Sequence, residues 1–291
     1  QQPVVVHGSA HYLERNGFEV VNRAGQRVSP SAAVGSDGYT VRQRPGSKNA
    51  LGEVKFVFPN DADGNAWGDS TLGLPGPLAA AGYELVDPGR YQPMNNDFSS
   101  QIAAFKAAGC EIVTGVMIPP DFATFWAQAA QQGFNPKVVT IGKALLFPSS
   151  VDALGDRGDG LTTEVWWTPD YPFSSSLTGM SAKALGDAYV AESGKSWTAT
   201  LGFQHALFEV GLDVVKRAAD LTDKASIIEA IVTTNLNTMV GPINWANGPM
   251  KNVTKTPMAG GQWQRRDGKL ELVIVNNKQN PNLPVTGELT V

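Results

Sequence analysis

Apolar runs that each end in a turn recur along residues 54–142. Two helical stretches lie between them. Residues 97–109 begin at Asp97, a favoured N-cap residue, and end at Gly109, and residues 121–133 repeat this design. Short strands rich in Val and Ile that alternate with helices predict βαβ units on a parallel sheet, and hence an α/β fold. The apolar runs are Val54–Phe58, Tyr83–Val86, Glu111–Val116 and Lys137–Ile141.

The chain continues with a further strand and several helices. Residues 161–167, Leu-Thr-Thr-Glu-Val-Trp-Trp, predict a fifth strand. In residues 202–219, apolar side chains recur at spacings of three and four, which is typical of a helix with one apolar face. The other predicted elements are helices at 178–193 and 223–232 and a hairpin of strands at 261–264 and 270–275.

The loops that follow the predicted strands are the first candidates for function. Ligands of open α/β sheets bind beyond the carboxyl ends of the strands. The sequence therefore points to three loops, at residues 60–67, 118–122 and 142–145. The acidic run from Asp61 to Asn65 lacks the glycine and the glutamate that a calcium-binding EF-hand loop needs, so no metal site is predicted.

The composition is that of a folded protein with one large domain or two ordinary ones: 291 residues, 42% hydrophobic and 17% charged. The net charge of −4 and the absence of a Lys/Arg cluster argue against nucleic acid and against an anionic membrane surface as partners. No apolar run reaches the ~18 residues of a membrane-spanning helix. Cys110 is the single cysteine, which excludes an internal disulfide and predicts a small buried residue there.

The motifs of common α/β enzymes are absent from the sequence. It contains neither a Gly-x-Ser-x-Gly nucleophile elbow nor a Gly-x-x-x-x-Gly-Lys-Ser/Thr phosphate loop, and no Gly-x-Gly-x-x-Gly follows a predicted strand. The three histidines, His7, His11 and His205, do not have the spacing of a metalloprotease. We therefore expect a binding protein without catalytic residues and without a cofactor.

Six segments occur in an order that can be compared with known families: 29–32, 39–42, 54–68, 97–102, 133–137 and 203–219. This order resembles the substrate-binding proteins of ABC importers, of the leucine/isoleucine/valine-binding type, which are type I periplasmic binding proteins. The likeness extends from about Val54 to Trp263 and is partial before Val54. Each motif is weak by itself, and their order carries the resemblance.

The resemblance implies two lobes, each a parallel sheet flanked by helices, with a ligand held between them by hinge closure. The N-terminal lobe would comprise residues 1–50 and 168–250, and the C-terminal lobe residues 51–167 and 251–291. The family opens with a strand, a helix, a strand and a helix before the segment that matches residues 4–10. The N-terminal lobe of this chain is therefore expected to lack its first strands and helices, and the sequence leaves the reason open.

The resemblance also implies which residues touch the ligand. In the family, hydroxyls and backbone N–H groups of the first two strand-end loops bind a ligand carboxylate, as such donors do in general. An aromatic wall is implied where Trp67 stands, with further contacts after the third strand of the 54–142 stretch and from one of two adjacent tryptophans. The expected ligand-binding residues are Ser9, Ala10, Ser31, Ala32, Ala33, Trp67, Ile118, Pro119, Phe122, Lys143 and Trp166.

Lys143 bears on the charge of the ligand. Amino-acid-binding members of the family have a carboxylate near this position, which pairs with the ligand ammonium, whereas this chain has Ile-Gly-Lys-Ala-Leu. A buried ammonium without a counter-charge costs several kcal/mol. We therefore expect a carboxylate, an aromatic compound or an amide rather than a plain α-amino acid. Glu164, which lies mid-strand, is the nearest acidic candidate by sequence for holding a cation instead.

Together, these features predict a periplasmic or extracytoplasmic solute-binding protein. It would capture a small organic ligand between two lobes and deliver it to the permease subunits of an ABC importer, its only contact with a membrane protein. A ligand-sensing domain of a receptor or regulator uses the same fold and remains an alternative, as does a branched-chain amino-acid binder.

Overall fold

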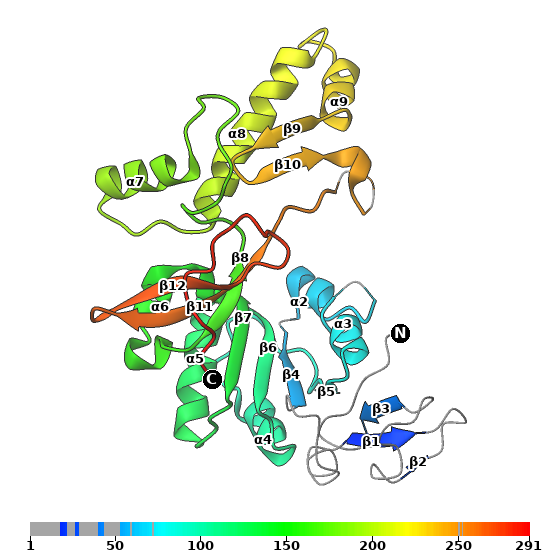
Figure 1. Ribbon diagram of the computed structural model, residues 1–291, viewed down its shortest axis with the longest axis vertical. Helices are drawn as coiled ribbons and strands as arrows, with labels where there is room; N and C mark the ends of the chain where they lie inside the picture. Colours follow the sequence, from blue (N-terminus) through cyan, green and yellow to red (C-terminus); the bar gives the residue numbers. More distant parts are fainter. Residues whose placement is uncertain are drawn as a thin grey trace. The chain divides into compact units, whose positions relative to one another are not determined.

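The computed structural model describes residues 18–21, 27–28, 40–43, 53–58, 60–71, 73–249, 251 and 253–291. The chain divides into two compact units, Gln1–Thr140 and Ile141–Val291. Figure 1 shows the order of the elements along the chain. The two lobes expected from the resemblance have other boundaries and stay a prediction.

A seven-stranded mixed sheet has the strand order β12-β11-β8-β7-β6-β4-β5. Strand β4 is parallel to both β5 and β6, which confirms the predicted parallel pairing, whereas β11 is antiparallel to β8 and β12. The boundary between the two units falls inside β7. The strands are β4 (Glu53–Val57), β5 (Glu84–Val86), β6 (Ile112–Met117), β7 (Val138–Lys143), β8 (Thr162–Val165), β11 (Ala259–Arg266) and β12 (Lys269–Asn276).

The first unit contains a small antiparallel sheet as well. Its order is β2-β1-β3, with β1 at Phe18–Val21, β2 at Arg27–Val28 and β3 at Thr40–Gln43. The helices of this unit are α2 (Ala62–Trp67), α3 (Pro75–Ala80), α4 (Ser99–Ala107) and α5 (Pro119–Gln131).

The two predicted helices of the first unit, α4 and α5, agree with the sequence except at their starts. Helix α5 begins at Pro119 and not at Asp121, because proline is well tolerated in the first turn, where its missing N–H has no partner to lose. At α4, the Asp97 carboxylate accepts the Ser99 N–H at 2.8 Å, so Asp97 supports the helix start one residue before the formal N-cap. Helices α2 and α3 were not predicted.

The second unit adds helices and a two-stranded antiparallel sheet, β9 (Asn235–Thr238) with β10 (Gly241–Asn244). The predicted helices are present, and Asp223 caps α9 by accepting the N–H groups of Ala225 and Ser226. Within the described residues, no helix is long and apolar enough to cross a membrane. The longer helices of this unit are α7 (Ala182–Ser193), α8 (Thr200–Arg217) and α9 (Lys224–Val232), with a shorter one at α6 (Pro148–Asp152).

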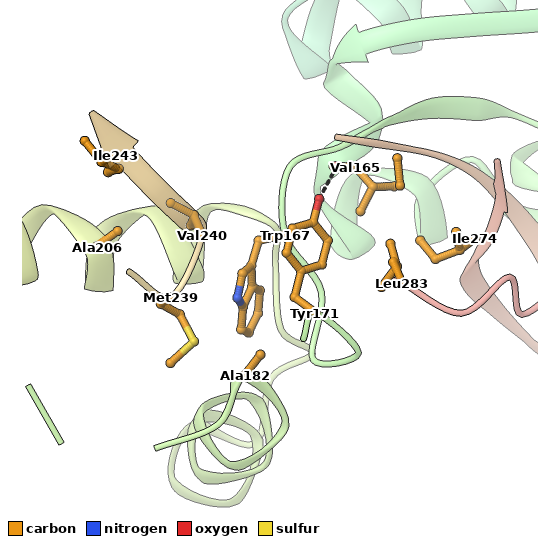
Figure 2. Packing of buried hydrophobic residues seen from close by; sticks show 11 residues of the cluster. Val165, Trp167, Tyr171, Ala182, Ala206, Met239, Val240, Ile243, Ile274 and Leu283 are labelled. Atoms are coloured by element: carbon orange, nitrogen blue, oxygen red, sulfur yellow. Dashed lines mark hydrogen bonds between the residues drawn. The ribbon is translucent and has the colours of Figure 1, made fainter. Parts of the chain in front are cut away.

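A buried cluster of the second unit includes Trp167, which has no exposed surface (Figure 2). Tyr171 is part of this cluster, and its hydroxyl donates to the Val165 carbonyl at 3.1 Å and to the Pro257 carbonyl at 3.0 Å. These bonds tie the segment after β8 to the segment before β11. The segment at residues 168–173 therefore begins inside a packed core.

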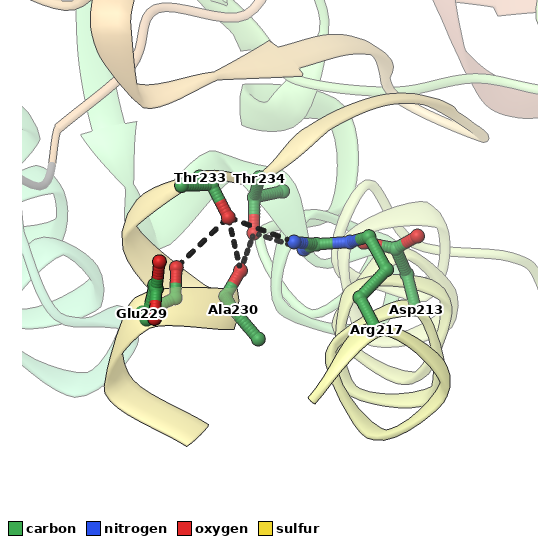
Figure 3. A network of polar contacts seen from close by, with 6 residues as sticks. All are labelled: Asp213, Arg217, Glu229, Ala230, Thr233 and Thr234. Carbon is green, nitrogen blue, oxygen red and sulfur yellow. Dashed lines mark hydrogen bonds and ion pairs between the residues drawn. The ribbon is translucent and has the colours of Figure 1, made fainter. Parts of the chain in front are cut away.

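The ends of α8 and α9 are joined by polar contacts around Arg217 (Figure 3). The Arg217 guanidinium donates to Asp213 at 2.7 Å and to the hydroxyls of Thr233 and Thr234 at 3.0 and 3.1 Å. Because the two threonines follow α9 directly, the guanidinium fixes the end of α9 against α8.

Candidate functional site

The ligand-binding residues expected from the sequence are divided by the structure into three groups. Trp67, Ile118, Pro119 and Phe122 lie in the first unit, and Lys143 and Trp166 lie in the second. The remaining five, Ser9, Ala10, Ser31, Ala32 and Ala33, lie outside the described residues.

Trp67 ends helix α2 and is half-buried. It packs against two buried residues: Phe58, which follows β4, and Val116, which lies in β6. Helix α2 is positioned by Asp61, whose carboxylate caps it by accepting the Gly64 N–H at 2.8 Å. The indole is therefore held by a capped helix on the core while part of its surface remains exposed.

The loop after β6 enters α5 through Ile118 and Pro119, which are both half-buried. Phe122 is only 2% exposed, and its ring stacks on Trp126 with centroids 6.1 Å apart. In this conformation Ile118 and Pro119 present more surface to a ligand than Phe122 does.

Two buried polar residues in the first unit were not singled out by the sequence: Asp121 and Tyr91, which are 1% and 3% exposed. Asp121 accepts the Met94 N–H at 3.2 Å, and Met94 has a positive φ of 62°. Burial, followed by the Asp121 and Asp61 carboxylates, raises the pKa of Tyr91, and burial also raises the pKa of Asp121. The only feature of the sequence that could have indicated this pair is that Asp121 lies in the first turn of a helix that begins with proline.

In the second unit, Lys143 ends β7. Its backbone φ is 66°, a value that residues other than glycine rarely adopt. Its backbone N–H donates to Glu164 Oε1 at 3.1 Å, and Thr163 Oγ1 lies 3.3 Å from Glu164 Oε2. Burial raises the pKa of Glu164, while hydrogen bonds from Lys143, Thr163 and Trp166 oppose this rise.

Glu164 and Trp166 are two residues apart near the end of β8 and therefore belong to the same face of the strand. Both are half-buried, whereas Val165 and Trp167 on the other face are buried. Trp166 also meets Phe203 of α8 edge-to-face, with ring centroids 5.8 Å apart. Lys143, Glu164 and Trp166 thus form one cluster at the carboxyl ends of β7 and β8.

This cluster joins the Lys143 backbone N–H, the Glu164 carboxylate and the Trp166 indole at the ends of the two strands. The carboxylate of Glu164 is used by donors of the chain itself, as are those of Asp61 and Asp121. No group of three or more His, Cys, Asp or Glu suited to a metal ion occurs within the described part of the chain.

The family model of the periplasmic binding protein matches residues 50–269, about three quarters of the chain. The chain belongs to this family. The α/β fold with its mixed sheet is the type I periplasmic-binding-protein architecture expected from the sequence. A comparison with curated proteins found no match.

Solved structures of solute-binding proteins have the same fold. A leucine-binding protein from Thermotoga maritima is 20% identical, with a TM-score of 0.61, over 78% of this chain and 61% of that one. An ABC-transporter solute-binding protein from Rhodopseudomonas palustris, in complex with 4-hydroxybenzoate, is 15% identical, with a TM-score of 0.62, over 81% and 63%. Another from Rhodopseudomonas palustris BisB5, in complex with 3,4-dihydroxybenzoic acid, is 18% identical, with a TM-score of 0.62, over 78% and 60%. The chain thus spans about three fifths of the length of these proteins.

Proposed function

We propose that this periplasmic binding protein captures a small carboxylate, aromatic or amide ligand and delivers it to the permease of an ABC importer, without chemical turnover. It acts in the periplasm or another extracytoplasmic space. The proposed contacts are those expected from the sequence, among them Trp67, Lys143 and Trp166. The two lobes that would close on the ligand are proposed with the boundaries given above.

The proposed ligand class rests on one observation: the acidic side chains near the strand ends already accept hydrogen bonds from the chain itself. Glu164, Asp61 and Asp121 each accept an N–H of the chain itself. An ammonium ligand would have to compete with these internal donors, and we place the ligand carboxylate at the Lys143 ammonium, as the sequence suggests. Charge-assisted hydrogen bonds of that kind are about twice as strong as neutral ones.

The solved structures include proteins for both ligand classes, aromatic carboxylates and an amino acid. Two of them contain hydroxylated benzoates, which are aromatic carboxylates, and one is a leucine-binding protein. At identities of 15–20% these likenesses establish the fold, so the ligand has to be tested directly. Leucine is the natural competitor in that test.

Calorimetric titration and thermal unfolding with 4-hydroxybenzoate, benzamide and leucine test the proposal. A ligand that binds only the folded protein at 100 times its dissociation constant adds about 2.7 kcal/mol to the free energy of unfolding. We expect 4-hydroxybenzoate or benzamide to bind and to be recovered unchanged. Tighter binding of leucine would contradict the ligand class, and recovery of an altered compound would contradict the absence of turnover.

A further inference from the structure

The carboxyl group of Glu164 contacts residues of two neighbouring strands. Its Oε1 accepts the Lys143 N–H at the end of β7 at 3.1 Å, and the Trp166 side chain donates to the same carboxyl group. Its other oxygen, Oε2, lies 3.3 Å from Oγ1 of Thr163, a residue that is only 3% exposed. Glu164 is therefore bonded to two of the residues proposed to contact the ligand, Lys143 and Trp166.

The Thr163 hydroxyl indicates which protonation state of Glu164 this geometry favours. Oγ1 lies 3.0 Å from the Ile141 carbonyl, to which it donates, as well as 3.3 Å from Oε2 of Glu164. A hydroxyl has one proton and two acceptor lone pairs, so Thr163 can donate fully to only one of these oxygens. While Ile141 receives that proton, an ionised Oε2 faces a lone pair of Oγ1, whereas a protonated Oε2–H donates to it. All these contacts are satisfied together when Glu164 carries a proton on Oε2.

The elements around Glu164 bring few charges to it. Strand β8 lies between β7 and β11, and the 3-10 helix η2 (Ala144–Leu146) also packs against it. Strand β11 places Gly260 opposite Glu164, and His205 of α8 is bonded to a serine hydroxyl at 2.7 Å. Of the described residues of β7, β11 and η2 next to this carboxyl group, only Lys143 has a titratable side chain. Burial and hydrogen bonds therefore set the pKa of Glu164, and burial raises it.

We propose that Glu164 is the positioning residue through which pH acts on the ligand site. In its neutral form, Oε2–H donates to Thr163, which donates in turn to Ile141. When the proton of Glu164 leaves to solvent, the Thr163 hydroxyl turns from the Ile141 carbonyl to Oε2. The bonds from the Lys143 N–H and from Trp166 then become charge-assisted and about twice as strong. The ionisation of one carboxyl group thus sets how firmly the Trp166 indole and the end of β7 are held.

The consequence for the ligand rests on the proposed function. A ligand carboxylate at Lys143 lies near Glu164, and like charges at short distance disfavour each other's ionised form. A carboxylate ligand should therefore bind better to neutral Glu164 and take up a proton on binding, whereas benzamide should bind both forms alike. Glu164→Gln imitates the neutral form permanently, because an amide both accepts and donates as a protonated carboxyl group does.

Infrared difference spectroscopy of the ligand-free protein tests the proton on Glu164 directly. In the difference between wild type and Glu164→Gln, the C=O stretch of a protonated carboxyl group should persist above pH 4.5, the usual pKa of glutamate. Asp121, whose pKa is also raised, is present in both proteins and cancels. A difference without this band above pH 4.5 would overturn the proposal.

Tryptophan fluorescence over the same pH range tests the positioning of Trp166. We expect a step whose midpoint coincides with the infrared titration and which disappears in both Glu164→Gln and Trp166→Phe. Trp126→Phe removes another half-buried tryptophan, from α5, and is the matched control that should keep the step. Far-UV circular dichroism checks that the variants fold. A step that survives in Trp166→Phe, or a carboxyl titration without any step, would refute a positioning role.

Calorimetric titration with 4-hydroxybenzoate, in buffers of different ionisation enthalpy, tests the link to the ligand. Above the pKa of Glu164, the wild-type dissociation constant should rise by up to about tenfold per pH unit with uptake of a proton, and it should stay constant in Glu164→Gln. A wild-type constant that is independent of pH would overturn this link. If 4-hydroxybenzoate does not bind at all, the ligand class of the proposed function fails, while the infrared and fluorescence titrations still decide the role of Glu164.

Discussion

The indole of Trp167 occupies the space into which a side chain at Gly202 would project. A Cβ at residue 202 would lie 2.3 Å from Cγ and Cδ1 of the ring, far inside van der Waals contact. The glycine thus lets the segment after β8 pack directly on the start of α8.

Gly202→Ala should therefore destabilise the protein despite the higher helix propensity of alanine. We expect the free energy of unfolding to fall by about 2–3 kcal/mol, the scale of overpacking in a tight core, as measured by urea denaturation. Gly211→Ala in the same helix is the matched control. It has open space around it and should raise the free energy of unfolding by up to about 1 kcal/mol. Equal effects of the two substitutions would refute the packing argument.

Glu209 is a carboxylate with no exposed surface. It accepts the N–H and hydroxyl of Ser176 and, at 2.8 Å, the N–H of Met239, and so links α8 to two loops. Glu209→Ala would leave the buried N–H of Met239 unpaired and remove the bonds to the exposed Ser176, and we expect a loss of about 1–3 kcal/mol in the free energy of unfolding. Glu192→Ala, at an exposed position of α7, should change it by less than about 0.5 kcal/mol. A Glu209 variant as stable as the control would show that water replaces the carboxylate.

Most strands and helices were predictable because their signals are local. Val- and Ile-rich runs and N-cap residues predicted β4 to β8 and α9 within a few residues. Helix α2 was missed because six residues rich in Asp, Gly and Asn have low helix propensity, and its Asp61 cap and the packing of Trp67 on Phe58 outweigh that cost. Such tertiary contacts leave no periodic pattern in the sequence.

The candidate site was less predictable for the same reason. Sequence spacing put Lys143 and Trp166 near strand ends, but it could not show that Glu164 bonds the Lys143 backbone, since the two residues come from neighbouring strands. Asp121 and Tyr91 are 30 residues apart, and only the fold brings them together.

The raised pKa of Glu164 predicts how stability depends on pH. Because burial raises the pKa of this carboxyl above its usual 4.5, the folded state binds its proton more tightly than the unfolded state does. Between pH 4.5 and the raised value, the free energy of unfolding therefore falls as the pH rises. Glu164→Gln removes this titration but keeps an oxygen for the Lys143 N–H.

Urea denaturation of both proteins from neutral pH down to that window measures this effect. Relative to Glu164→Gln, the wild-type protein should gain stability as the pH is lowered, because its carboxyl becomes neutral. Asp121 has a shift in the same direction, and it is common to both proteins, so it cancels in the difference. A difference that is independent of pH would mean that Glu164 has the same pKa in both states.

The last prediction concerns Lys143 and the charge of the ligand. Lys143→Ala should weaken binding of 4-hydroxybenzoate by roughly 1.5–3 kcal/mol, the value of a hydrogen bond to a charged group, and leave benzamide nearly unaffected. Lys143→Gly should weaken 4-hydroxybenzoate equally, yet raise the free energy of unfolding by about 1 kcal/mol, because glycine adopts a φ of 66° without strain. Lys137→Ala, at the other end of the same β7 region, is the control for loss of one positive charge.

Calorimetric titration of the three variants separates the effect of the Lys143 charge on ligand binding from the effect of the backbone conformation at residue 143. If Lys137→Ala weakens 4-hydroxybenzoate as much as Lys143→Ala does, the effect is long-range and Lys143 makes no direct contact. Tight binding of leucine that disappears in Glu164→Gln would instead show that Glu164 gives up its internal donors to hold a ligand ammonium. The carboxylate assignment would then be replaced by an amino-acid ligand.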